Sequence, residues 1–301
     1  MRKALIGLSI LVIVIGIVEL FRARLSEDTQ PFALRPSSPE DKEPSPQLAI
    51  VLDDWGYSRK NLPLLFSIKA PLTIAVLPLT PYATETAERA KREGMEVILH
   101  LPLEPHRSNI NLEEETIMCG MGREEIARIL ALALARVPGA QGVSSHMGSK
   151  ATEDRVLVTF LLEEIRLRDL FFLDSITTPR SACKDVAREV GVRFIKRDGL
   201  FLDIQYKERE DIHQRLIGLA KIALRSKEAV GIGHAKQETL EVIQKTLPEL
   251  EAMGVRLVYL SKIVNPAPRL KTRGFLEKYS FNAPFRPRLE KRGFIGCGVD
   301  K

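Results

Sequence analysis

Carboxylate and imidazole side chains stand at the ends of short apolar runs along this chain of 301 residues. In parallel α/β folds the carboxyl ends of the strands share one face, and that face carries the active site. One carboxylate with two imidazoles is a ligand set for a catalytic divalent metal with an open position, and zinc suits it best. A second carboxylate beside the metal ligand is then free to act as a base. The residues in such positions are Asp53, Asp54, His100, His146, Asp174, Asp198 and His234.

The adjacent residues Asp53 and Asp54 also have a purely structural interpretation, as a solvated turn or a helix cap. Side chains of neighbouring strand residues point in opposite directions, so the pair serves one site only if the backbone bends or bulges. The nearby Gly56 favours such a bend.

The other candidates have structural alternatives as well. His100 lies among apolar neighbours and could be a hydrogen-bonded core histidine. His146 and His234 lie among small residues, which let backbone and substrate approach closely. The remaining carboxylates, Asp174 and Asp198, are equally consistent with helix caps or with ion pairs. Arg180 and Arg197 are the possible ion-pair partners.

Short apolar runs alternate with longer amphipathic stretches through the middle of the chain. Several runs are almost wholly apolar and β-branched, as is typical of strands covered by helices on both faces. This alternation predicts a parallel sheet, either open or closed into a barrel. The predicted strands are residues 48–54, 72–78, 96–102, 142–148, 170–175, 192–198, 230–235 and 255–261. The predicted helices are residues 81–93, 123–136, 153–168, 181–190, 208–226 and 237–253.

The turn after the first run argues against a nucleotide-binding sheet. Such a sheet carries G-x-G-x-x-G at this point, whereas the run here ends in D-D-W-G at 53–56. A later G-I-G at 231–233 lacks the third glycine, because residue 236 is Lys. The sequence also contains no Walker loop.

The N-terminal part of the chain differs in composition from the rest. Arg2 and Lys3 precede an almost uninterrupted apolar run, so residues 1–25 are predicted to be a signal peptide or an uncleaved signal-anchor. Membrane contact would then run through residues 4–21. Residues 26–46 are rich in Pro, Ser and charge and are predicted to be a disordered linker.

The net charge of the chain comes from its C-terminal tail. Residues 266–301 contain nine Lys/Arg and three Asp/Glu, so 9 − 3 = +6 accounts for the whole formal charge of +6. The globular body at 47–265 is therefore neutral overall, and only 6% of the chain is aromatic. These values give no reason to expect a nucleic-acid partner.

Motifs at the predicted strand ends form a recognisable set. They are L-D-D-W-G at 52–56, H-L-P-L-E-P at 100–105, S-H-M-G-S at 145–149, F-L-D-S at 172–175, R-D-G-L-F-L-D at 197–203 and G-H-A at 233–235. Together they resemble the divergent polysaccharide deacetylase family, a branch of the NodB-like carbohydrate esterases. The resemblance covers roughly residues 47 to 264. It implies a distorted (β/α) barrel of about seven parallel strands and metal-dependent hydrolysis of amides or esters on acetylated sugars.

The resemblance also implies roles for individual residues. Asp53 matches the base, Asp54 the metal-binding aspartate and His234 the histidine that acts as general acid. The paired H-[ST]-x-x-H metal motif of NodB-like enzymes is absent from this chain. The assignment of His100 and His146 as the other two ligands therefore rests on their strand-end positions and on the divergent branch.

The sequence thus predicts an exported hydrolase that is periplasmic or membrane-anchored. It also predicts a divalent metal cofactor, and the expected ligands favour zinc. Its substrate would be an envelope or extracellular glycan, such as an acetylated polysaccharide or a peptidoglycan fragment. The alternative is a catalytically silent envelope protein that keeps the barrel for glycan or protein binding. The candidates for orienting the catalytic groups or the sugar are Glu104, Asp174, Arg180, Arg197 and Asp198.

Overall fold

The computed structural model describes residues 45–204, 208–264 and 266, and strands alternate with helices throughout this part of the chain. The strands are β1 (Gln47–Trp55), β2 (Thr73–Val76), β3 (Glu96–Leu103), β4 (Gly142–Met147), β5 (Phe171–Asp174), β6 (Arg193–Lys196), β7 (Glu228–His234) and β8 (Arg256–Val258). The helices are α2 (Leu62–Ser67), α3 (Ala83–Arg92), α4 (Arg123–Arg136), α5 (Arg155–Leu167), α6 (Cys183–Val190), α7 (Arg209–Ser226) and α8 (Gln237–Ala252). All predicted strands and helices are present, and α2 was not predicted because six residues are too few for a helical period.

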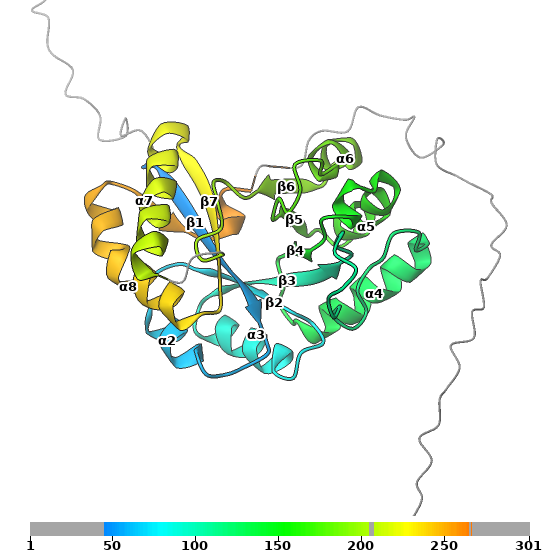
Figure 1. The fold of residues 1–301 in the computed structure, drawn as a ribbon, viewed down its shortest axis with the longest axis horizontal. Helices are drawn as coiled ribbons and strands as arrows, with labels where there is room; N and C mark the ends of the chain where they lie inside the picture. Colours follow the sequence, from blue (N-terminus) through cyan, green and yellow to red (C-terminus); the bar gives the residue numbers. More distant parts are fainter. Residues whose placement is uncertain (1–44, 205–207, 265, 267–301) are drawn as a thin grey trace, which may run out of the picture. The chain divides into compact units, whose positions relative to one another are not determined.

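The sheet is a nearly closed barrel of parallel strands in the order β6-β5-β4-β3-β2-β1-β7. The predicted fold class is therefore confirmed. β7 pairs with β1 along Gln47 to Asp53, and β8 pairs in parallel with the first three residues of β1. Figure 1 shows the helices outside the sheet, with α7 and α8 beside β1 and β7.

The gap in the barrel lies between β6 and β7, and the segment that follows β6 bridges it. The backbone N–H of Asp198 donates to the carbonyl of Val230 at 2.9 Å, and the N–H of Val230 donates to Asp198 Oδ2 at 3.0 Å. The N–H of Leu202 donates to the carbonyl of Ile232 at 2.8 Å. An irregular segment thus forms hydrogen bonds with the backbone groups on the edge of β7 that no strand covers.

Alternate residues of most strands belong to two separate layers of the core. Ala49 and Val51 of β1, Ile98 of β3 and Val230 and Ile232 of β7 pack together in the barrel interior. The intervening residues of β1 pack with the helices in the larger outer layer. This two-sided burial explains why the strands are almost continuously apolar, and it determines which residues at the strand ends face inward.

The two ends of the chain contribute nothing to this description. The predicted export segment, the linker up to residue 44 and the basic tail from residue 267 lie outside the described residues. In the part that the structure covers, no helix combines the length and the apolar character needed to cross a membrane.

Gly56 makes the tight turn that follows β1. Its φ is +117°, and its carbonyl accepts the N–H of Tyr82 at 2.8 Å. A Cβ at this position would lie 2.1 Å from Thr80 Oγ1 and 3.2 Å from the carbonyl oxygen of Leu77. Only glycine fits here, because a side chain would meet both an unfavourable φ and a steric clash.

We expect Gly56→Ala to destabilise the protein more than the matched variant Gly94→Ala. Gly94 also has a positive φ, of +80°, but a Cβ there would have no neighbour within 4 Å. Gly94→Ala should cost about 1 kcal/mol for the backbone conformation alone. Gly56→Ala should cost an additional ~1–3 kcal/mol for overpacking. Urea denaturation of both variants measures the difference, and equal losses would contradict the importance of the turn.

Candidate functional site

The alternation of the strands brings four ionisable side chains to the mouth of the barrel. Asp53 continues the inward-facing series of Ala49 and Val51, and its register partner in β7 is His234. His100 follows inward-facing Ile98 by two residues. His146 lies two residues beyond Ser144, the register partner of His100 on β4. These side chains share the carboxyl-end face that the sequence predicted.

Asp54 reaches the same face by a different route, since regular alternation would turn its side chain outward. Its φ is +64°, in the left-handed region, and the pairing of β1 with β2 shifts register between Leu52 and Trp55. The predicted bend is therefore present, and it lies at Asp54 itself. A non-glycine residue in this conformation costs free energy and is often found at functional sites.

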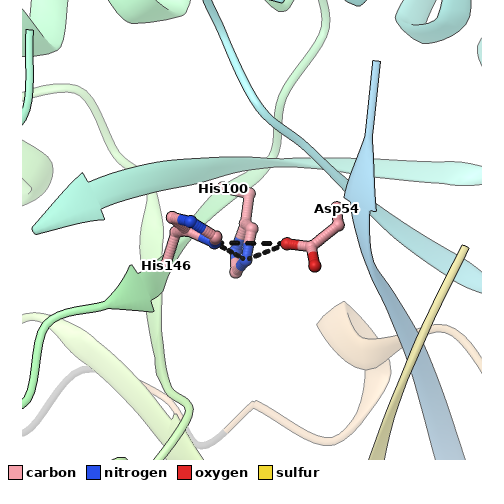
Figure 2. Close-up of side chains that lie close together, drawn as sticks. All are labelled: Asp54, His100 and His146. Carbon is pink, nitrogen blue, oxygen red and sulfur yellow. Dashed lines mark hydrogen bonds and ion pairs between the residues drawn. The ribbon is translucent and has the colours of Figure 1, made fainter. Parts of the chain in front are cut away.

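The side chains of Asp54, His100 and His146 converge on one point (Figure 2). Asp54 Oδ1 lies 3.3 Å from His100 Nε2 and 3.2 Å from His146 Nδ1, and these two nitrogens are 3.1 Å apart. Ligand bonds of 2.0–2.1 Å in a tetrahedral zinc site place the ligand atoms about 3.3 Å from one another. The triangle therefore has the size that such an ion requires.

Buried carboxylate oxygens in this cluster that lack a hydrogen-bond partner in the described part of the chain are also consistent with a bound cation. Asp54 Oδ1 and Asp53 Oδ1 are buried and have no hydrogen-bond partner among the described residues. Buried carboxylate oxygens are costly unless they are paired or bind a metal. The donor set and the buried oxygens thus both fit a divalent ion held by Asp54, His100 and His146.

The two adjacent aspartates have opposite electrostatic environments. Burial raises the pKa of Asp53, which is 2% exposed, and the nearby imidazoles offset only part of this effect. Burial also acts to raise the pKa of Asp54, but the imidazoles of His100 and His146 outweigh it and hold that pKa well below its ordinary range. When the pKa values of two neighbouring carboxylates move apart, the two groups can take different roles. The one with the lower pKa suits an anionic ligand, and the one with the higher pKa suits a proton acceptor.

His234 is held by a carboxylate that the sequence analysis did not select, Asp203. Asp203 Oδ1 lies 2.5 Å from His234 Nδ1, while its Oδ2 accepts the backbone N–H of His234 at 2.8 Å and the hydroxyl of Thr239 at 2.6 Å. The other ring nitrogen of His234, Nε2, lies 3.9 Å from Asp54 Oδ2. Burial lowers the pKa of His234, but Asp203 outweighs this and the net shift is upward. The arrangement directs Nε2 toward the triad of Asp54, His100 and His146.

Comparison with known proteins agrees with this geometry. A family model for divergent polysaccharide deacetylases matches residues 50–264. The chain belongs to this family. The resemblance inferred from the strand-end motifs is confirmed.

Two curated relatives and one solved structure illustrate the similarity. An uncharacterized protein of Haemophilus influenzae is 32% identical over 227 residues, which cover 74% of this chain and 80% of that protein. The Escherichia coli protein YibQ is 35% identical over 219 residues, which cover 73% of this chain and 67% of YibQ. The crystal structure of uncharacterized protein ATU2773 from Agrobacterium tumefaciens shares the fold. Its TM-score is 0.70 at 24% identity, over 75% of this chain and 92% of that one.

Arg197, one of the predicted orienting residues, contacts the aromatic ring that lies beside His234. Its guanidinium donates to the carbonyls of Ser175 at 2.9 Å and Ile176 at 3.1 Å. It also stacks on the ring of Phe201 at 4.0 Å, and that ring lies 5.7 Å from the ring of His234. Arg197 therefore supports the segment that carries Asp203, while its role toward a sugar stays a prediction.

The other predicted orienting residues hold loops at the barrel mouth. Asp174 lies at an outward-facing position of β5. Its carboxylate accepts hydrogen bonds from the hydroxyl of Ser181 at 2.6 Å and from the N–H of Ile176 at 2.9 Å. Glu104 accepts hydrogen bonds from Lys150 Nζ at 2.5 Å and from the N–H of Cys119 at 2.7 Å.

The last two predicted orienting residues also have structural partners. Arg180 forms an ion pair with Glu153 at 2.9 Å, and Asp198 accepts a hydrogen bond from β7. No contact joins these four side chains to the triad among the interactions described, and their roles toward substrate stay predictions.

We expect His146→Ala to lose stoichiometric divalent metal, because two remaining ligands cannot hold the ion in place. His213→Ala is the matched control, since His213 lies on α7 and pairs with Glu249 at 2.7 Å. Elemental analysis of both purified variants checks this. Full metal occupancy in His146→Ala would show that the ligand set is wrong.

Proposed function

We propose that this protein is an exported, metal-dependent hydrolase that removes acetyl groups from an envelope or extracellular glycan. The observation that carries the proposal is Asp53: a buried carboxylate with a raised pKa, 3.7 Å from His100 Nε2, beside a triad of metal-ligand type. Membership of the divergent polysaccharide deacetylase family supports the substrate class.

The metal site would be formed by Asp54, His100 and His146, and this His₂Asp donor set suits Zn²⁺. A divalent ion at such a site polarises a carbonyl and lowers the pKa of a water ligand toward about 7. With Asp54, His100 and His146 as its ligands, the ion would remain accessible to substrate and water.

Asp53 would act as the general base. It is adjacent in sequence to the proposed ligand Asp54, and the bend at Asp54 places that second carboxylate, like Asp53, near His100. Burial raises the pKa of Asp53, so this carboxylate is a better proton acceptor than an exposed aspartate. It would take a proton from water as the oxygen adds to the acetyl carbon.

His234 would act as the general acid. Asp203 binds its Nδ1 at 2.5 Å, which directs Nε2 toward the triad and stabilises the protonated ring. The proton on Nε2 would pass to the leaving nitrogen or oxygen of the sugar as the bond to the acetyl carbon breaks. The products are acetate and the deacetylated glycan, and Asp203 acts as a positioning residue.

We expect Asp53→Asn to keep its metal but to lose turnover by ~10²–10⁴-fold, the usual contribution of a positioned general base. Asp54→Asn should lose metal and turnover together, because a neutral amide is a poorer ligand for a charged ion. The measurement is acetate release from chitin-like and peptidoglycan fragments, with metal content and melting temperature as controls. Unchanged turnover in Asp53→Asn would refute its role as the base.

The same assay tests the alternative of a silent glycan- or protein-binding barrel. A wild-type protein that holds its metal but releases no acetate from any acetylated fragment would favour that alternative over a hydrolase.

Export is part of the proposal and rests on residues 1–25. We expect a fusion of this segment to a reporter that is active only in the periplasm to be active, because a basic start and a long apolar run direct export. A Val12→Arg fusion, which interrupts the apolar run, is the matched control and should be inactive. A wild-type fusion that stays inactive in the cytoplasm would contradict export.

A further inference from the structure

The two histidines of the triad differ in how their second ring nitrogen is used. His100 directs Nε2 to the triad, and its Nδ1 lies 2.8 Å from the hydroxyl oxygen of Ser144. His146 directs Nδ1 to the triad, and its Nε2 is buried and has no hydrogen-bond partner among the described residues. Histidine ligands almost always donate this second N–H to a carboxylate, carbonyl or water, which fixes the tautomer and the ring orientation. His146 therefore requires an acceptor.

Glu113 is the carboxylate that faces this nitrogen. Its Oε1 lies 4.0 Å from His146 Nε2, and its side chain is about one-quarter exposed. An ordinary hydrogen bond of 2.7–3.2 Å would need a displacement of about 1 Å. A rotation of one glutamate side chain supplies a movement of this size.

Two contacts already hold Glu113 in this position. The hydroxyl of Tyr57, three residues after Asp54, donates to Glu113 Oε1. The buried Thr116 donates its hydroxyl to the backbone carbonyl of Glu113 at 2.6 Å. The residue thus belongs to a loop between β3 and α4 that is tied to the turn after β1, next to the metal ligands.

We infer that Glu113 is a positioning residue for His146: its carboxylate accepts the Nε2–H, so that the Nδ1 lone pair points at the metal. The hydroxyl of Tyr57 donates to the same carboxylate oxygen, Oε1, and holds it in place. This inference rests on the proposed metal centre and adds a residue that neither strand ends nor motifs indicate. A carboxylate in this position also raises the basicity of the imidazole as a ligand.

The test is the dissociation constant for Zn²⁺ of the full protein, measured by competition with a chromophoric chelator. Glu113→Leu removes the acceptor and should weaken Zn²⁺ binding roughly 10- to 100-fold, the usual effect of losing an outer-shell partner. Glu113→Gln removes the same charge but keeps an acceptor oxygen, so its loss should be smaller. Glu114→Gln is the matched control, because it removes a charge from the neighbouring exposed residue and should leave binding unchanged.

A second readout separates positioning from general destabilisation. The visible absorption spectrum of the Co²⁺-loaded protein reports ligand geometry, and it should change in Glu113→Leu while the melting temperature stays close to that of the wild type. Equal Zn²⁺ affinity in Glu113→Leu and the wild type would overturn the inference alone. Equal losses in Glu113→Leu and Glu113→Gln would also overturn it, because the effect would then be one of charge. A wild type that binds no Zn²⁺ would overturn the proposed metal centre as well.

Discussion

The left-handed backbone of Asp54 is the constraint on which the candidate site depends. In a regular strand Asp53 would face the barrel interior and Asp54 the helices, so one of the two carboxylates would be lost to the site. With φ at +64°, both carboxylates lie within 3.7 Å of His100 Nε2. Asp53 keeps the inward orientation of the strand and is almost fully buried, whereas the bend brings Asp54 to two imidazoles. Their pKa values therefore move in opposite directions. A local conformational cost thus gives two neighbouring carboxylates the different environments that the proposed ligand and the proposed base require.

The gap in the barrel contributes to the site as well. Direct pairing of β6 with β7 would have closed the barrel with regular hydrogen bonds, but the irregular segment after β6 joins β7 through Asp198 and Leu202 instead. The chain then continues directly to Asp203, which binds His234 at the end of β7. Closure of the fold and orientation of the proposed general acid therefore depend on one short segment. Arg197 supports that segment through Phe201.

Much of the fold and part of the site could be predicted from the sequence. The apolar runs and helical periods located the strands and most helices, and the strand-end positions of His100, His146 and His234 indicated one shared face. Alternation alone would also have separated outward-facing Asp174 from the inward-facing residues, because Phe171 and Leu173 fill the interior. Asp203 and Glu113 could not be found in this way. Both lie in irregular segments, and their partners are 31 and 33 residues away, so that only the folded chain brings them together.

In the proposed centre, Asp54 binds a catalytic metal with His100 and His146 while Asp53 stays outside the coordination sphere. Anomalous diffraction from crystals of the Zn²⁺-loaded protein, recorded on both sides of the zinc absorption edge, tests this most directly. We expect one strong anomalous peak about 2 Å from Asp54 Oδ1, His100 Nε2 and His146 Nδ1, with no bond to Asp53. A peak coordinated by Asp53, or no peak between these three side chains, would contradict the account.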